Sequence, residues 1–278
     1  MRKIIILLAL ILVGMLIPAG FSTNDSQVVI TYGETTYNNA NYKTTVDNFF
    51  TSQAGVDLNT VGSKIITASE VNKISSTITG KTYSSNQIFS SALVDLNDNA
   101  ELKVSVDKSK ITTITGDMYI SALKSAGITA GHVYVTSPIT ATGESALAGI
   151  MNSYEEVTDV EIPDTVKEAA NNEIYTQAEI VKNSDVDADE LSKLVDDVKE
   201  EVAVNNITDH STIVIIINNY TVTNNINITN SDIENLANSI EQIQNVQGDV
   251  NNYENQVSDI LNSTDVNDAK GFLNGLFN

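Results

Sequence analysis

Four aspartates near the middle of the chain have the spacing of an ion-binding loop. Asp185, Asp187 and Asp189 alternate along the sequence, and Asp196 follows eleven residues after the first of them. Carboxylates at alternate positions are typical of calcium loops. Position six is Glu190, however, where such a loop needs a glycine for its sharp turn. The alternative is that Asp187 caps a helix and that its acidic neighbours interact favourably with the helix dipole.

The residues typical of catalysis form no recognisable set in the sequence. His132 and His210 are far apart, and neither has a second metal ligand at helical or hairpin spacing. We expect His132 on the solvent face of a strand, because no nucleophile of recognisable geometry accompanies it. Gly143-Glu-Ser145 begins like a nucleophile elbow, but Leu147 stands where that motif needs its second glycine. We therefore expect no catalytic residue, no cofactor and no metal site other than the calcium candidate.

Asparagine is abundant, with 32 in the chain and 18 of them from Asn205 to the end. In an exported protein, an asparagine two residues before serine or threonine is a candidate glycan acceptor. A segment so rich in these residue types also generates the triplet by chance. The triplet occurs at Asn24, Asn206, Asn219, Asn227 and Asn262.

The first half of the chain predicts a sheet. Runs of β-branched residues bounded by turn residues indicate strands at 27–33 and 64–68, and alternating valines indicate another around Val133. The segments 87–95 and 102–106 flank a turn-prone Asn-Asp-Asn sequence, and we expect them to form a hairpin.

Helices are expected between these strands. Thr115 can cap a helix that ends at Gly127, and Thr142 can cap a second helix that extends to Tyr154. A sheet covered by such helices is typical of an α+β or a mixed α/β domain.

The composition changes near Asp159. Between Glu155 and Glu201 there are 16 acidic residues and four lysines, and the apolar residues take helical spacing. Ser231 and Glu234 have the spacing of a capping box ahead of a further helix. Apolar stripes predict helices from here to the C-terminus, through positions that include 191–202, 233–243, 250–261 and 266–277.

The segment 212–222 supports two interpretations. Its many β-branched residues favour a strand by propensity alone. Its neighbours on both sides are predicted helices with which it would have to pack.

The sequence between Thr115 and Gly149 carries three motifs that together resemble a known family. They are T-G-D-M-Y from Thr115, V-Y-V-T-S-P ending at Pro138, and T-G-E-S-A-L-A-G ending at Gly149. The combination is similar to domain-of-unknown-function family 1002, whose members are exported proteins of Gram-positive bacteria and archaea. The resemblance is specific over about residues 65–154 and looser to about residue 247.

The resemblance implies export, a sheet domain followed by helices, and a helix at 212–222. It implies no reaction, because the family has no established activity. Glycine and proline at the ends of predicted elements have backbone reasons to be there, so we expect the motif residues to be mainly structural. These residues are Thr115, Gly116, Met118, Tyr119, Pro138, Thr142, Gly143 and Gly149.

The first 22 residues have the order of a secretory signal. Arg2 and Lys3 precede an apolar run from Ile4 to Ile17, and small residues follow it. We expect cleavage before Thr23, with an uncleaved N-terminal anchor as the alternative. We expect no membrane-spanning segment in the mature protein, because the most apolar internal run is too short.

Charge and cysteine content exclude several classes of protein. The formal net charge of −21 disfavours nucleic acids and anionic membrane surfaces as partners. The chain contains no cysteine, which excludes disulfides, thiolate metal sites and a cysteine nucleophile. A hydrophobic fraction of 41% is enough for a folded core.

Together these patterns predict an α+β protein in three segments. Residues 1–22 form the signal peptide, 23–158 a mixed sheet-and-helix domain, and 159–278 an acidic, asparagine-rich and mainly α-helical region. We expect an exported protein that binds a partner at the cell envelope or outside the cell without catalysis. The alternative is an envelope-acting hydrolase with an unrecognised carboxylate or Ser/Thr site.

Overall fold

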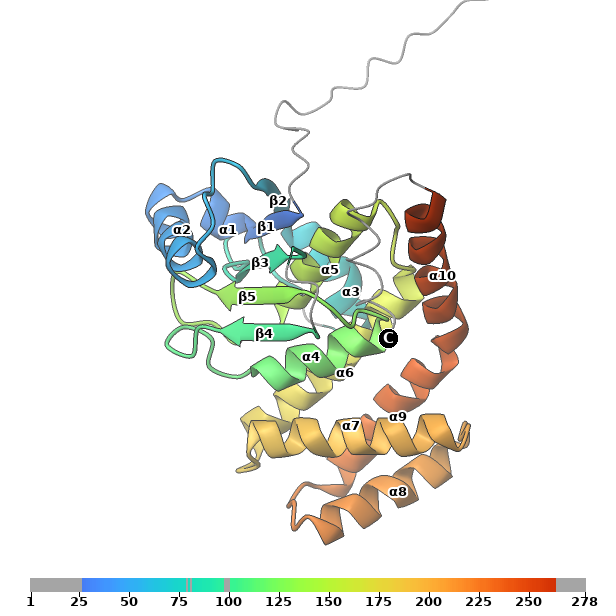
Figure 1. Ribbon diagram of the computed structural model, residues 1–278. Coiled ribbons are helices and arrows are strands. Elements are labelled where there is room, and N and C mark those ends of the chain that lie inside the picture. Colours follow the sequence, from blue (N-terminus) through green and yellow to red (C-terminus); the bar gives the residue numbers. More distant parts are fainter. Residues whose placement is uncertain (1–26, 79, 81, 98–100, 264–278) are drawn as a thin grey trace, which may run out of the picture.

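The computed structural model describes residues 27–78, 80, 82–97 and 101–263. The expected signal peptide, Asn24 and the stripe at 266–277 lie outside these residues. Within them the chain has an α+β fold, with a five-stranded sheet at one end and a layer of helices at the other (Figure 1).

The sheet is mixed, with the strand order β2-β1-β3-β5-β4. β1 and β2 are parallel, β4 and β5 are parallel, and β3 is antiparallel to both of its neighbours. The strands are β1 (Val28–Gly33), β2 (Gly62–Ile66), β3 (Ser91–Asp95), β4 (Lys103–Val106) and β5 (His132–Thr136).

The predicted hairpin of β3 and β4 is wrong. β5 lies between these strands and pairs with both of them, Leu93 opposite Tyr134 on one side and Ser105 opposite Tyr134 on the other. The helix between β4 and β5 returns the chain parallel to β4, as in a βαβ unit. That crossover places β5 beside β4, where the local turn pattern had predicted β3. Val133 and Val135 of β5 are fully buried there.

Helices cover both faces of the sheet. Along β3, Leu93 points to a cluster with Val46 and Phe50 of α2, whereas Ala92 and Val94 belong to the larger cluster on the opposite face. That opposite face packs against α4 and α5. The helices of this half are α1 (Glu34–Tyr37), α2 (Ala40–Ala54), α3 (Ala68–Ile78), α4 (Gly116–Ser125) and α5 (Ser145–Thr158).

Five helices follow: α6 (Asp164–Asn183), α7 (Ala188–Val204), α8 (His210–Thr223), α9 (Asn230–Asn245) and α10 (Gln247–Ser263). The predicted stripes of α7 and α9 are buried, Leu191 and Ile240 among them. α6 packs against α4 on one side and α9 on the other. Ile174 of α6 and Tyr253 of α10 belong to the same hydrophobic cluster as the strands, so the main core crosses the expected boundary between residues 158 and 159.

The segment 212–222 is helical, as the family resemblance implied. Ile213, Ile216 and Ile217 lie on one face of α8 and are buried with residues of α7 and α9. Asp209 caps the helix by accepting a hydrogen bond from the backbone N–H of Thr212. Packing and the cap therefore outweigh the β propensity of the segment.

Two of the predicted caps are displaced by a few residues. Thr115 caps α4 and Gly127 follows its end with φ +77°, as expected. α5 begins at Ser145, later than Thr142 would have placed it, because Gly143 has φ +112° and is not helical.

The capping box of α9 is formed by Thr229 and Asp232, not by Ser231 and Glu234. Thr229 Oγ1 accepts from the N–H of Asp232 at 3.1 Å, and the Asp232 carboxylate accepts from the N–H of Thr229 at 2.9 Å. The two pairs have the same spacing, so the sequence pattern alone does not separate them.

Candidate functional site

A groove of about 1120 Å³ lies between α6 and α9. Each helix contributes one row of polar residues to it, spaced three or four positions apart, so that the two rows face each other. The row on α6 consists of Thr165, Glu168, Asn172, Thr176, Glu179 and Asn183, and the row on α9 of Ser231, Asn235, Asn238, Gln242 and Asn245.

The two walls are held in register by packing below the groove and by a hydrogen bond across it. Ile180 of α6 is buried in the same cluster as Leu236 of α9. Asn172 Nδ2 donates to Gln242 Oε1 at 2.6 Å. Asn235 and Asn238 are exposed on the α9 wall, so their amides remain accessible from solvent.

The groove has negative and amide character. Among the described residues that line it there is no lysine or arginine, whereas four carboxylates are present. Amide side chains both donate and accept hydrogen bonds. The groove can therefore bind a polar ligand that is uncharged or cationic, and it repels an anion. The carboxylates are Glu168, Glu179, Asp232 and Glu241.

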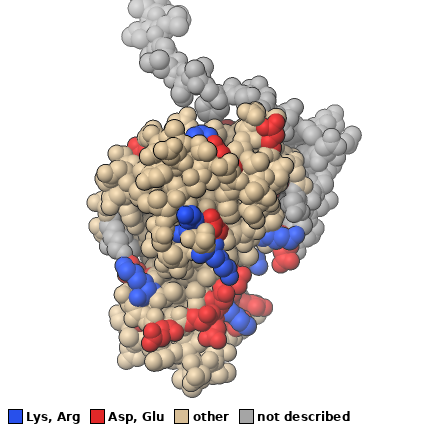
Figure 2. Space-filling model, turned by 90° about the vertical axis from the view of Figure 1, so that its left-hand side faces the viewer, with Lys and Arg blue, Asp and Glu red and all other residues tan. Residues whose placement is uncertain are grey.

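Acidic side chains also gather on another face of the molecule. On the face in Figure 2, most of the acidic side chains gather toward the lower end, which α7 and α8 form in Figure 1. The lysines on this face are more scattered.

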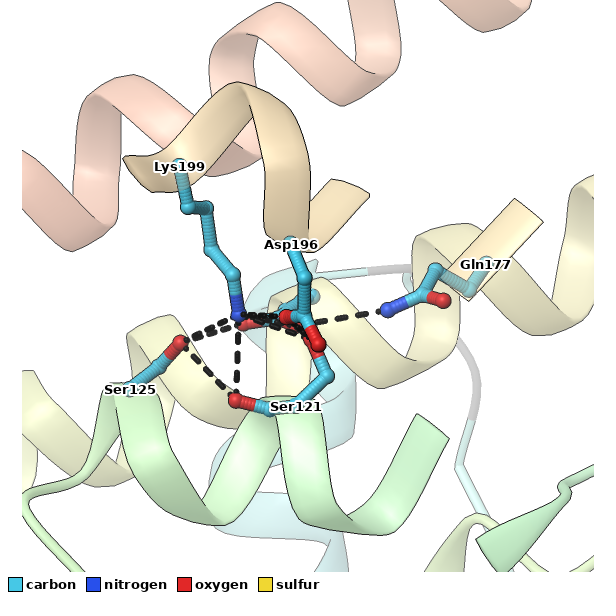
Figure 3. A network of polar contacts seen from close by, with 6 residues as sticks. Ser121, Ser125, Gln177, Asp196 and Lys199 are labelled. Atoms are coloured by element: carbon cyan, nitrogen blue, oxygen red, sulfur yellow. Dashed lines mark hydrogen bonds and ion pairs between the residues drawn. The ribbon is translucent and has the colours of Figure 1, made fainter. Parts of the chain in front are cut away.

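A second polar cluster is buried where α4, α6 and α7 meet (Figure 3). Lys199 Nζ, on α7, lies 2.8 Å from Glu173 Oε1 on α6 and 2.7 Å from Ser121 Oγ on α4. It also donates to Ser125 Oγ at 3.0 Å and forms an ion pair with Asp196 at 3.1 Å. Glu173 is 1% exposed and Lys199 13% exposed.

This cluster is arranged to hold helices together. A lysine beside a serine can activate the hydroxyl as a nucleophile. Ser121 is fully buried, however, and its Oγ is bonded to Glu173, which leaves no access for a substrate. The cluster therefore joins the sheet half of the molecule, through α4, to α6 and α7.

The predicted calcium ligands are not gathered around one point. Asp187 caps α7, and its Oδ1 accepts from the N–H groups of Asp189 and Glu190. Asp196 instead pairs with Lys199. Among the described residues, no group of three or more histidines or carboxylates is arranged to hold a metal ion.

His132 has a neighbour that the sequence did not indicate. Ser105 Oγ, on the adjacent strand β4, lies 2.9 Å from His132 Nε2. The phenol oxygen of Tyr134 lies 3.1 Å from His132 Nδ1, and the two rings stack at 4.2 Å. Ser105 is 27 residues from His132, so only the pairing of β4 with β5 brings them together.

The residues of the three sequence motifs meet in the packing around α4 and α5. Tyr119 OH donates to the carbonyl of Gly143 at 2.6 Å, and burial raises the pKa of this phenol well above its usual value. A Cβ on Gly116 would lie 2.8 Å from the carbonyl oxygen of Val104. A Cβ on Gly149 would lie 2.9 Å from a side-chain carbon of Thr31.

The remaining motif residues lie nearby. Thr115 Oγ1 accepts from the N–H of Met118, whose side chain is fully buried. Pro138 is buried just after the end of β5. Thr142 precedes α5 and is bonded to Glu144.

Comparison with known proteins agrees with these motifs. The family model for DUF1002, described as a protein of unknown function, matches residues 32–260. The chain belongs to this family. The resemblance inferred from the motifs is thereby confirmed. In this DUF1002 protein the matched region runs from β1 into α10, and thus includes the groove, the buried cluster and the Ser105 pair.

A curated relative of this DUF1002 chain is the uncharacterized protein YpuA of Bacillus subtilis (strain 168). The two are 33% identical over 147 residues, which are 52% of this chain and 50% of the relative. The chain thus spans about half the length of the curated relative that it matches. No solved structure matches the chain.

Three glycosylation candidates of the DUF1002 protein are exposed in the helical half. Asn206 follows α7 with φ +50°, Asn219 lies on the outer face of α8, and Asn227 precedes α9. Asn262 lies in α10. Within the described part of the chain, no helix combines the length and the apolar character needed to cross a bilayer.

His210 connects α8 to α9 through two carboxylates. Its Nε2 lies 3.0 Å from Glu234 and its Nδ1 lies 2.9 Å from Glu241. The hydrogen bond to Glu234, followed by that to Glu241, raises the pKa of His210 above 6.5. Asp209, beside it in the chain, adds a further negative charge.

This arrangement predicts a pH-dependent contribution to stability. Because the folded state raises the pKa, the contribution is fully present below pH 6.5 and disappears as the pH rises through the raised value. At about pH 5.5 the native protein should have a higher free energy of unfolding than His210→Gln. The difference should be less than about 1 kcal/mol, since His210 and its two carboxylate partners lie near the surface. Urea unfolding at about pH 8.5 should show no difference. If native protein and His210→Gln differ in unfolding free energy by the same amount at both pH values, this account is contradicted.

Proposed function

We propose that this protein is exported and binds an uncharged or amino-bearing glycan at the cell envelope or outside the cell. The first 22 residues support export, because they have the charge and apolar order of a secretory signal. Recovery of full-length protein with residues 1–22 intact from the cell interior would contradict that part of the proposal.

The observation that carries the binding role is the pair of facing polar rows on α6 and α9. Asparagines at helical spacing line both walls, among them Asn172 and Asn183 on α6 and Asn235 and Asn238 on α9. A glycan presents hydroxyl groups that both donate and accept, as the amides of the groove do. The repeated spacing of the rows suits a ligand that is itself a chain of similar units.

The charge of the groove selects among such chains. Its lining carboxylates favour an amino group and disfavour a uronate or phosphate. Binding in this groove needs no reacting group, because hydrogen bonds and charge are sufficient for recognition.

The affinity for the glycan should fall when one wall of the groove is obstructed. Asn235→Arg places a long cation in the groove, and it should weaken binding of an N-acetylglucosamine tetramer at least about tenfold, which is about 1.4 kcal/mol. Calorimetric titration of the native protein with this tetramer, a glucosamine tetramer and a galacturonate tetramer measures the selectivity. The first two should bind and the third should not.

A matched control is available on α8. Asn218 is also an exposed helical asparagine, but it does not line the groove, so Asn218→Arg should leave the affinity unchanged. Equal binding of all three tetramers, binding of none, or equal effects of the two substitutions would overturn the proposal.

A further inference from the structure

A second site, separate from the groove, lies on the sheet. Ser105, His132 and Tyr134 project from the same face of β4 and β5, since Ser105 pairs with Tyr134 in register and His132 lies two residues before it. All three side chains are only partly buried. β4 is the last strand of the sheet, so this pair lies near an edge.

The covering helix leaves this part of the face accessible. α2 packs its Val46 and Phe50 against Ile30 of β1 and Leu93 of β3, and Tyr134 lies at the margin of that cluster. Ser105 and His132 are partly exposed. They therefore form a hydrogen-bonded pair beside a packed cluster and not within it.

We propose that Ser105 is a nucleophile, activated by His132 and positioned by Tyr134, that accepts the acyl group of a small ester. The Ser105 Oγ to His132 Nε2 distance of 2.9 Å is within the range for a serine and its general base. With the imidazole proton on Nδ1, His132 donates to the Tyr134 oxygen at 3.1 Å and accepts from Ser105 through Nε2. Tyr134 is thus the third group that orients the base.

The proposed reaction is acyl transfer followed by hydrolysis. Ser105 Oγ forms a bond to the ester carbonyl carbon while its proton moves to His132 Nε2. The bond from that carbon to the leaving oxygen breaks, and the proton passes from His132 to the leaving alkoxide. A water molecule then attacks the acyl carbon and gives up a proton to His132. The bond from that carbon to Ser105 Oγ breaks and His132 returns the proton to Oγ, which releases the free acid and restores Ser105.

The surroundings indicate which substrates are suitable. Lys103 pairs in register with His132 and projects from the same face, so this face carries a cationic side chain, which favours an ester over a positively charged substrate. None of these residues lines the α6–α9 groove, so the ester site is separate from the proposed glycan site.

The test uses p-nitrophenyl acetate and the full chain. Native protein should release nitrophenol, and its intact mass should rise by one acetyl group located at Ser105. Ser105→Ala and His132→Gln should each lower the rate at least about 10²-fold, and the double variant should be no slower than either. Tyr134→Phe should lower the rate less, because it removes only the orienting hydroxyl.

Ser109→Ala is the matched control. Ser109 is exposed near the end of β4, and its hydroxyl donates to Asp107. It should leave the rate unchanged. The proposal is overturned if acetyl is found elsewhere or if Ser105→Ala retains the native rate, and urea unfolding of each variant separates loss of the nucleophile from loss of the fold. Glycan binding in the groove is unaffected in either case.

Discussion

Lys199→Met is expected to lower the free energy of unfolding by about 3–5 kcal/mol, because it leaves a buried carboxylate without its partner. Glu173 is 1% exposed and depends on the Lys199 ammonium, 2.8 Å away, for its countercharge. The same ammonium also donates to Ser121 and Ser125. Urea unfolding followed by circular dichroism measures the change.

A lysine six residues earlier on α7 provides the control. Lys193 forms an ion pair with Asp197 at 2.7 Å, and its side chain is 74% exposed. Lys193→Met should therefore destabilise the protein much less than Lys199→Met. The double variant Lys199→Met/Glu173→Gln should recover much of the lost stability, because no buried charge then remains unpaired. Equal losses for Lys199→Met and Lys193→Met would contradict the role assigned to the buried cluster.

Gly143→Ala is expected to destabilise the fold by about 2–5 kcal/mol, since it combines backbone strain with a steric clash. Gly143 has φ +112°, which residues with a side chain rarely adopt. A Cβ there would lie 2.8 Å from Ile111 Cγ2 and 2.9 Å from the Tyr119 hydroxyl. A movement that relieved this clash would disturb the hydrogen bond that the Tyr119 hydroxyl donates to the Gly143 carbonyl.

Gly55 separates the two contributions. It has φ +68° at the end of α2, but a Cβ there would have no atom within 4 Å. Gly55→Ala should cost only the backbone strain, about 1 kcal/mol. Thermal unfolding of the two variants makes the comparison. If Gly143→Ala costs no more than Gly55→Ala, the contact with Tyr119 and Ile111 is not important for the fold.

The parts of the fold that follow from local periodicity were predictable. Leu191, Val195 and Val198 recur at helical spacing, and all are buried on α7. The cap at Thr115 and the left-handed conformation of Gly127 were also predictable from the sequence. Both residues lie next to the ends of α4, so the signal is local. The helix at 210–223 needed the family resemblance, since its β propensity pointed the other way.

The arrangement of distant segments was not predictable from the residues. The order of β3, β5 and β4 depends on the crossover through α4, which a local turn pattern does not reveal. α2 was not identified because few of its residues are apolar, although Val46 and Phe50 are fully buried.

The candidate sites were missed for the same reason. Ser105 and His132 come from different strands, and Lys199 is 78 residues from Ser121. The rows of the groove did carry a sequence signal, since Asn235, Asn238 and Asn245 recur at intervals that place them on one helix face. That spacing predicts a polar stripe, but the facing stripe on α6 appears only in the folded chain.

The central claim is that the groove binds a ligand, and nuclear magnetic resonance tests it most directly. The measurement follows the backbone amide chemical shifts of the native protein during titration with the N-acetylglucosamine tetramer. We predict shifts concentrated in residues 165–183 of α6 and 231–245 of α9, growing with ligand to a plateau. Shifts at the sheet or on α8 with none along these two helices, or no shifts at saturating tetramer, would contradict the account.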